Sequence, residues 1–150
     1  MDSLTLWIMQ MDIPWLTPVA AALDRDIVML AVTLLLVLLG EQRKGKIAKI
    51  AVAVALAAIL SLAIKEVVKS ERPCETLASK IPCNGGYSFP SSHTIVAFTV
   101  MLAFLNKPSF PIYLMYAIFV AFTRIYLGMH SFEDVAGSAA LAPFMYYITD

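Results

Sequence analysis

The sequence is poor in charged residues. Only 15% of its 150 residues are charged, against about 25% in an ordinary soluble domain. Lysine and arginine together number 11, as do aspartate and glutamate, so the formal net charge is zero. A neutral chain offers no broad basic surface, which argues against nucleic acid as a partner. There are just two histidines and two cysteines, and their spacing is not that of a zinc site.

Hydrophobic residues make up 60% of the chain and come in long blocks rather than in alternation. No basic stretch and cleavage site of a signal peptide precede them, and we find no internal repeat. The blocks predict an all-α, multi-pass transmembrane helical bundle that forms a single membrane-embedded domain, residues 1–150. Its helical core covers residues 26–149. The five expected spans are residues 26–40, 47–64, 91–105, 109–127 and 131–149.

The first 24 residues are apolar but interrupted by polar residues and prolines near their middle. A spanning helix would bury Asp12 near the centre of the bilayer, at a cost of a few kcal/mol or more. Trp7 and Trp15 suit the membrane interface. We therefore expect residues 1–24 to form an interfacial or re-entrant segment, and the alternative is a kinked sixth span.

Residues 41–49 carry the densest basic cluster, with Arg43, Lys44, Lys46 and Lys49. The positive-inside rule places this cluster in the cytoplasm of a cell-membrane protein. The loops after the second and fourth spans then share the extracytoplasmic face. Cys74 and Cys83 lie in the first of these loops. They are either free thiols or a disulfide, and the extracytoplasmic position favours the disulfide.

Polar residues gather on that same face. Lys65 and Arg72 are seven residues apart, so on one continuing helix they share a face about 10 Å apart. His130 and Asp134 are four residues apart at the start of the last span. The remaining members are found at the start of the third span and the end of the fourth: Ser91, Ser92, His93 and Arg124.

This combination of residues suits a phosphate group. Arginine, lysine and the first amides of a helix bind phosphate oxygens. A histidine with a carboxylate four residues on is an oriented base or nucleophile, and a second histidine can supply a proton. We therefore infer phosphoryl transfer through a covalent intermediate. No carboxylate cluster for magnesium is evident, so we expect a metal-independent mechanism without a cofactor.

Simpler interpretations exist for each part. Lys65, Lys69 and Arg72 could be interfacial anchors whose charged ends reach the headgroups. His130 and Asp134 could be a helix-capping pair, although that leaves Arg124 unexplained. An unpaired arginine near a membrane boundary is costly, so we expect a bound anion or Asp134 as its partner.

Three stretches of the sequence resemble the signature motifs of the type 2 phosphatidic acid phosphatase superfamily. They occupy residues 65–73, 90–93 and 124–134, and they read Lys65-x6-Arg72-Pro73, Pro90-Ser91-Ser92-His93 and Arg124-x5-His130-x3-Asp134. The resemblance implies a nucleophile that forms a phosphohistidine (His130), its orienting carboxylate (Asp134), a proton donor (His93), and phosphate ligands (Lys65, Arg72, Ser91, Ser92 and Arg124).

The sequence departs from the family pattern at two positions. Ser92 stands where the second motif usually has glycine, which narrows the approach to the phosphate. Thr123 replaces a serine and keeps the hydroxyl. The substrates that the resemblance implies are membrane lipids: polyprenyl pyrophosphate, phosphatidic acid or phosphatidylglycerol phosphate. The alternatives are a lipid-to-lipid phosphotransferase and a non-catalytic protein that binds or transports anionic lipid.

Overall fold

The structure is a computed structural model that describes residues 2–83 and 85–149. These residues form eight helices and no β-strand, which confirms the all-α prediction. In chain order the helices are α1 (Ser3–Gln10), α2 (Leu16–Asp24), α3 (Asp26–Gly40), α4 (Lys44–Val68), α5 (Pro73–Thr76), α6 (Ser92–Ala103), α7 (Phe110–Tyr126) and α8 (Phe132–Tyr147).

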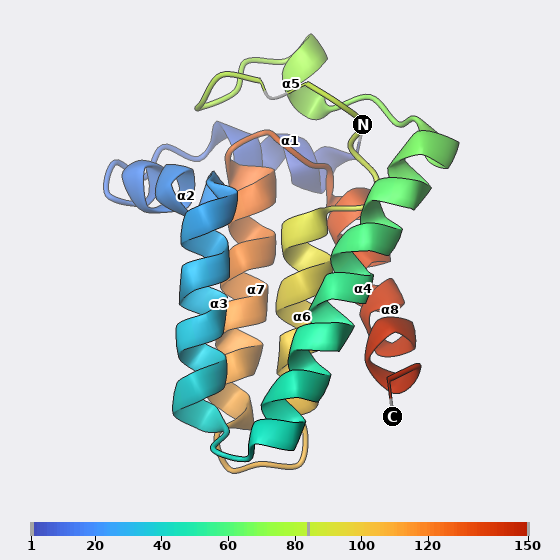
Figure 1. Ribbon diagram of the computed structural model, residues 1–150. Coiled ribbons are helices and arrows are strands. Elements are labelled where there is room, and N and C mark those ends of the chain that lie inside the picture. Colours follow the sequence, from blue (N-terminus) through green and yellow to red (C-terminus); the bar gives the residue numbers. More distant parts are fainter. Residues whose placement is uncertain (1, 84, 150) are drawn as a thin grey trace.

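Five of the helices run lengthwise and form a bundle, with α6 in contact with α3, α4, α7 and α8 (Figure 1). They lie where the sequence predicted the five spans. By length and composition, α4 alone among the described helices is long and apolar enough to cross a membrane, while α3, α6 and α7 are apolar but shorter. The number of spans therefore stays a prediction.

Small side chains let the helices of the bundle approach closely. Three of the four buried residues of α4 are small, namely Ala53, Ala57 and Ser61, and Ala97 is buried on α6. Such faces are typical of helices that associate within a membrane. Large apolar side chains point outward instead and remain exposed, as lipid-facing residues would: Leu34, Leu39, Ile59, Ile112 and Met115.

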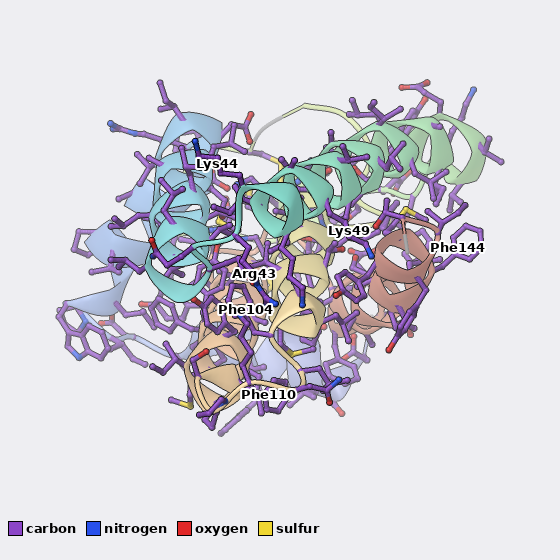
Figure 2. The ribbon with its side chains drawn as sticks, turned by 60° about the horizontal axis from the view of Figure 1, so that its bottom comes forward. Arg43, Lys44, Lys49, Phe104, Phe110 and Phe144 are labelled. Atoms are coloured by element: carbon purple, nitrogen blue, oxygen red, sulfur yellow. A yellow bond between two sulfur atoms is a disulfide. The ribbon has the colours of Figure 1, made fainter. Side chains whose placement is uncertain are left out.

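The basic cluster lies at one end of this bundle. Figure 2 shows Arg43, Lys44 and Lys49 at the end where α3 turns into α4 and α6 into α7. The carboxylate of Glu41 ties the two turns together, because it accepts hydrogen bonds from Nε of Arg43 at 3.0 Å and from Nζ of Lys107 at 2.9 Å. These two cations hold the pKa of Glu41 far below its usual value.

At the opposite end, α1 and α2 lie across the bundle rather than along it (Figure 1). They have eight and nine residues and are separated by a turn. Residues 3–24 thus form two short helices instead of one helix of spanning length. Trp7 and Trp15 are 61% and 66% exposed. This arrangement fits the interfacial alternative for the N-terminal segment.

The predicted continuation of α4 beyond Lys65 is partly wrong. The helix ends at Val68 and does not continue to Arg72. Lys69 takes a left-handed conformation with φ of 52° and ends the helix. Arg72 therefore lies in the connection to α5 and does not share a helix face with Lys65.

A substitution at Gly40 can test how tightly α3 packs at its C-terminal end. A Cβ there would overlap the hydroxyl of Tyr113 and meet the ring of Phe104. Overpacking of this kind costs about 1–3 kcal/mol, so Gly40→Ala should lower the midpoint of thermal unfolding in detergent. Gly45→Ala is the control, because its Cβ meets open space and alanine favours the helix. Equal melting temperatures for the two variants would contradict this packing.

Candidate active site

A cavity of about 490 Å³ opens at the end of the bundle covered by α1, α2 and α5. It lies between the start of α6, the ends of α4 and α7, and the α2–α3 corner. Its lining contains most of the predicted site residues: Lys65, Arg72, Ser92, His93, Arg124 and His130. It also contains three carboxylates that were not predicted: Asp24, Asp26 and Glu66.

A tight turn after α7 places His130 on the cavity wall. Gly128 has φ of +81°, which glycine adopts without strain. The carbonyl of Arg124 then accepts hydrogen bonds from the amides of both Met129 and His130, at 3.1 and 3.3 Å. His130 is thereby fixed beside the last turn of the helix that carries Arg124.

Asp134 holds the other side of the His130 ring. It forms a capping box with Ser131, whose amide donates to Oδ2 at 2.8 Å. The buried hydroxyl of Ser88 donates to the same oxygen at 2.5 Å and lies 3.3 Å from Nδ1 of His130. Nδ1 itself is 3.7 Å from Oδ2. Since these groups gather around Nδ1, Nε2 is the ring nitrogen left for chemistry in the cavity.

Burial lowers the pKa of His130 to about 4, although the nearby Asp134 carboxylate acts in the opposite direction. The charges of Arg72 and Lys65 lower this pKa further. The imidazole is therefore neutral at pH 5–8, and a neutral imidazole has the lone pair that a nucleophile requires.

Lys65 and Arg72 both line the cavity. Lys65 lies on α4, and Arg72 lies in the connection that follows α4. Nζ of Lys65 donates to the carbonyls of Tyr87 and Ser88 at 2.8 and 2.9 Å. Arg72 donates from Nε to the carbonyl of Gly86 at 3.0 Å and from Nη1 to that of Met129 at 3.1 Å. Both cations thus hold the two loops of the site in place while their charges face the cavity.

Arg124 has a different partner from the one expected. Its buried guanidinium donates from Nη1 to Oδ1 of Asp24 at 2.6 Å and from Nη2 to the carbonyl of Ala20 at 3.3 Å. Of the two partners expected for Arg124, a bound anion or Asp134, the second is therefore wrong. The partner comes from α2, about 100 residues earlier in the chain, which explains why spacing within the motif could not show it.

The start of α6 divides its polar residues between capping and the cavity. Ser91 caps the helix by accepting from the amide of Thr94 at 3.4 Å, and its own amide donates to the hydroxyl of Ser138 at 2.8 Å. Ser91 is buried and is not among the residues that line the cavity, so its role as a phosphate ligand stays a prediction. The hydroxyls of Ser92 and Ser61 are 2.8 Å apart, and Ser92 does line the cavity.

Ser88, Asp24 and Asp26 are site residues that sequence reasoning missed. Ser88 belongs to the glycine-rich approach to α6 but has no distinctive spacing, and only the fold brings it to Asp134. Asp24 and Asp26 flank the start of α3, where charged residues commonly mark a helix boundary. Nothing in the sequence connects them with residues of α6 and α7.

Cys74 and Cys83 form a disulfide in the structure, with their Cα atoms 5.5 Å apart. The bond joins α5 to the segment that leads back to the bundle, at the same end as the cavity (Figure 1). It closes a loop within the connection between Arg72 and the start of α6. The disulfide therefore limits the motion of the segment that supplies Gly86, Tyr87 and Ser88 to the site.

The fold and the site together have the features of a membrane-associated phosphatase, and comparison with known proteins gives the family. The chain belongs to the PAP2 superfamily, which matches residues 46–149. It is 33% identical over 133 residues to the putative undecaprenyl-diphosphatase YbjG of Escherichia coli (strain K12), a match that covers 83% of this chain and 67% of that protein. The chain is accordingly an enzyme of the PAP2 phosphatase type.

Two solved structures are similar to this fold. LpxE of Aquifex aeolicus superposes with a TM-score of 0.79 at 25% identity, covering 97% of this chain and 92% of that one. The first transmembrane PAP2-type phosphatidylglycerolphosphate phosphatase from Bacillus subtilis superposes with a TM-score of 0.76 at 18% identity, covering 98% and 81%. The likeness extends beyond the motifs to the N-terminal helices α1 and α2.

The protonation of His130 can be measured directly. Histidine-labelled protein in micelles should show a His130 imidazole that stays neutral from pH 8 to pH 5 and titrates near pH 4, because burial lowers its pKa. The stability that the neutral ring confers is complete above about pH 6.5 and is lost as the pH falls through 4. His130→Gln assigns the signal. A midpoint near 6.5 would show that the ring is not buried as described.

Proposed function

We propose that the protein hydrolyses a lipid phosphate or pyrophosphate monoester through a phosphohistidine on His130. One observation carries the proposal: a neutral histidine backed by a buried carboxylate and a second histidine line one cavity together with three cations. The three cations are Lys65, Arg72 and Arg124. Their charges would stabilise the equatorial oxygens of a transferring phosphoryl group.

The reaction has two steps. In the first, Nε2 of His130 attacks the terminal phosphorus, and the bond from that phosphorus to the departing oxygen breaks. The departing oxygen is the lipid oxygen of a monophosphate or the bridging oxygen of a pyrophosphate, and His93 gives its proton to it. In the second, water attacks the phosphohistidine, the N–P bond breaks, and a proton of the water passes to His93. Phosphate leaves and both histidines return to their first protonation states.

A second, apolar groove supports a lipid as the substrate. It has a volume of about 290 Å³, and it shares Asp26, Leu62, Ser92 and His93 with the catalytic cavity. Away from the cavity it is lined by apolar side chains of α3, α4 and α6: Met29, Leu30, Ala58 and Val96. A headgroup in the cavity would therefore lead its hydrocarbon chain into this groove. We place a polyprenyl pyrophosphate first among the candidate substrates because the relative YbjG is named a putative undecaprenyl-diphosphatase.

The site is proposed to face the extracytoplasmic side. Two features support this orientation: the basic residues Arg43, Lys44 and Lys49 lie at the opposite end of the bundle, and the disulfide lies at the same end as the cavity. Basic loops remain in the cytoplasm, and disulfides persist outside it.

The activity is tested by phosphate release in detergent with a chelator present, from polyprenyl pyrophosphate, phosphatidic acid and phosphatidylglycerol phosphate. His130→Ala should reduce release by at least about 10³-fold because the nucleophile is gone, while lipid binding measured by fluorescence persists. Glu133→Gln is the control, since this exposed carboxylate lies three residues away outside the cavity.

Each other outcome has a definite meaning. Binding without release from any of the three lipids would favour the non-catalytic binding or transport protein. Transfer of labelled phosphate to a second lipid instead of water would make the enzyme a phosphotransferase. Arrest by the chelator alone would contradict the metal-independent mechanism.

The groove can be tested separately from the chemistry. Leu62→Trp should raise KM for a long-chain lipid phosphate about tenfold, because the larger ring fills the junction of groove and cavity. KM for a short, water-soluble phosphate monoester should change little. Ile59→Trp is the matched control, since Ile59 is similarly exposed on α4 but does not line the groove. Equal effects on both substrates would remove the groove from the proposal.

A further inference from the structure

The α2–α3 corner brings two carboxylates to the catalytic cavity. Asp24 ends α2, Arg25 is extended with φ of −75° and ψ of 120°, and Asp26 begins α3. Both aspartates line the same cavity as His93 and His130. They precede residues 46–149, the part of the chain that matches the PAP2 superfamily. Negative charge in a phosphate site opposes substrate binding. The presence of these two aspartates therefore calls for an explanation other than phosphate binding.

Asp24 fixes the position of the corner. Its Oδ1 lies 2.6 Å from Nη1 of Arg124, whose side chain is 1% exposed, and the carbonyl of Ala20 on the same helix accepts from Nη2. An ion pair with one partner so deeply buried resists separation, because separation would leave a charge without compensation. The last turn of α2 is thus held against α7, and the residue that follows the corner, Asp26, is delivered to a defined place.

That place is beside the second catalytic histidine. Oδ1 of Asp26 lies 3.7 Å from Nε2 of His93. Nε2 is buried and, among the residues that the structure describes, has no hydrogen-bond partner. A buried polar atom of this kind is costly unless a partner meets it. Asp26 is 91% exposed, so a small rotation of its carboxylate closes the gap without repacking.

We propose that Asp26 is a positioning residue for the catalytic proton: its carboxylate accepts from Nε2 of the protonated His93 and holds that N–H at the cavity until the departing oxygen takes the proton. Several other charged groups face His93 from the elements around it, and they are Asp24, Lys65, Glu66, Arg72, Arg124 and His130. Arg124 disfavours a cationic His93, whereas Asp26 and Asp24 both favour it. Of these two carboxylates, that of Asp26 has its Oδ1 3.7 Å from Nε2. This inference rests on the proposed function.

The proton balance is simple. Asp26 takes no part in bond making and keeps its negative charge throughout. In the first step the proton on Nε2 of His93 passes to the lipid oxygen as its bond to phosphorus breaks. In the second step water supplies the hydroxide that attacks the phosphohistidine and the proton that returns to Nε2. The restored imidazolium again pairs with Asp26.

The test compares Asp26→Asn with wild type on two substrates that need the acid to different degrees. On a lipid phosphate whose leaving group is an alcohol, kcat should fall about tenfold. On 4-nitrophenyl phosphate, whose leaving group needs no proton, kcat should stay within about twofold of wild type. The alkaline limb of kcat/KM for the lipid should move about one pH unit toward acid, because the imidazolium has lost its counter-charge.

Glu133→Gln is the control, because it removes an exposed carboxylate that lies outside the cavity. It should leave both the substrate ratio and the alkaline limb unchanged. Asp26→Glu should restore part of the loss. In a His93→Ala background, Asp26→Asn should have no further effect on the lipid substrate, since there is no proton left to position.

A readout without turnover completes the test. The His93 imidazole of labelled protein should titrate at a lower pH in Asp26→Asn than in wild type. Equal losses on the two substrates, an unmoved alkaline limb or an unmoved His93 titration would overturn this inference. Wild-type protein that releases phosphate from no lipid would instead overturn the proposed function, and the His93 titration would still decide the role of Asp26.

Discussion

The arrangement of the proposed catalytic residues depends on the contacts of the Asp134 carboxylate. Its Oδ2 receives the amide of Ser131 and the hydroxyl of Ser88, and it faces Nδ1 of His130. One oxygen therefore caps α8, anchors the approach to α6 and holds the proposed nucleophile. These contacts occur where burial disfavours any unpaired polar group. Loss of the carboxylate would affect the fold and the chemistry together, so a simple Asp134 variant cannot separate them.

The division between an apolar body and a polar end explains why the site is built from helix termini. Along the bundle, small buried residues and outward leucines leave no place for charge, so the charged groups of the site gather where helices begin and end. His93 lies in the first turn of α6, Arg124 lies in the last turn of α7, and Asp134 lies in the first turn of α8. Helix ends also supply the unpaired amides and the connections that can bend around a phosphate.

The all-α fold and the cations and histidines of the cavity could be predicted, because long apolar blocks and residues at fixed spacing are visible in the sequence. His93, Arg124 and His130 lie together as expected. The course of the chain after Val68 could not be predicted. The helix ends at a left-handed residue, a position where glycine is usual, but here that residue is Lys69. The partner of Arg124 could not be predicted either: hydrophobic patterns identify helices, but they do not show which helix end meets which. Tertiary contacts of that range come only from the packed structure.

The charges of the cavity favour turnover over tight binding. Formal cations and carboxylates on its wall are equal in number: Lys65, Arg72 and Arg124 against Asp24, Asp26 and Glu66. A wall with cations alone would bind substrate and released phosphate strongly, which lowers KM without raising kcat. Because Asp24 engages Arg124, the attraction for a bound phosphate group is reduced. The guanidinium nevertheless stays in place for the charge distribution of the transition state. In the proposed reaction, the N-terminal helices would contribute to catalysis by limiting how firmly the ground state is held.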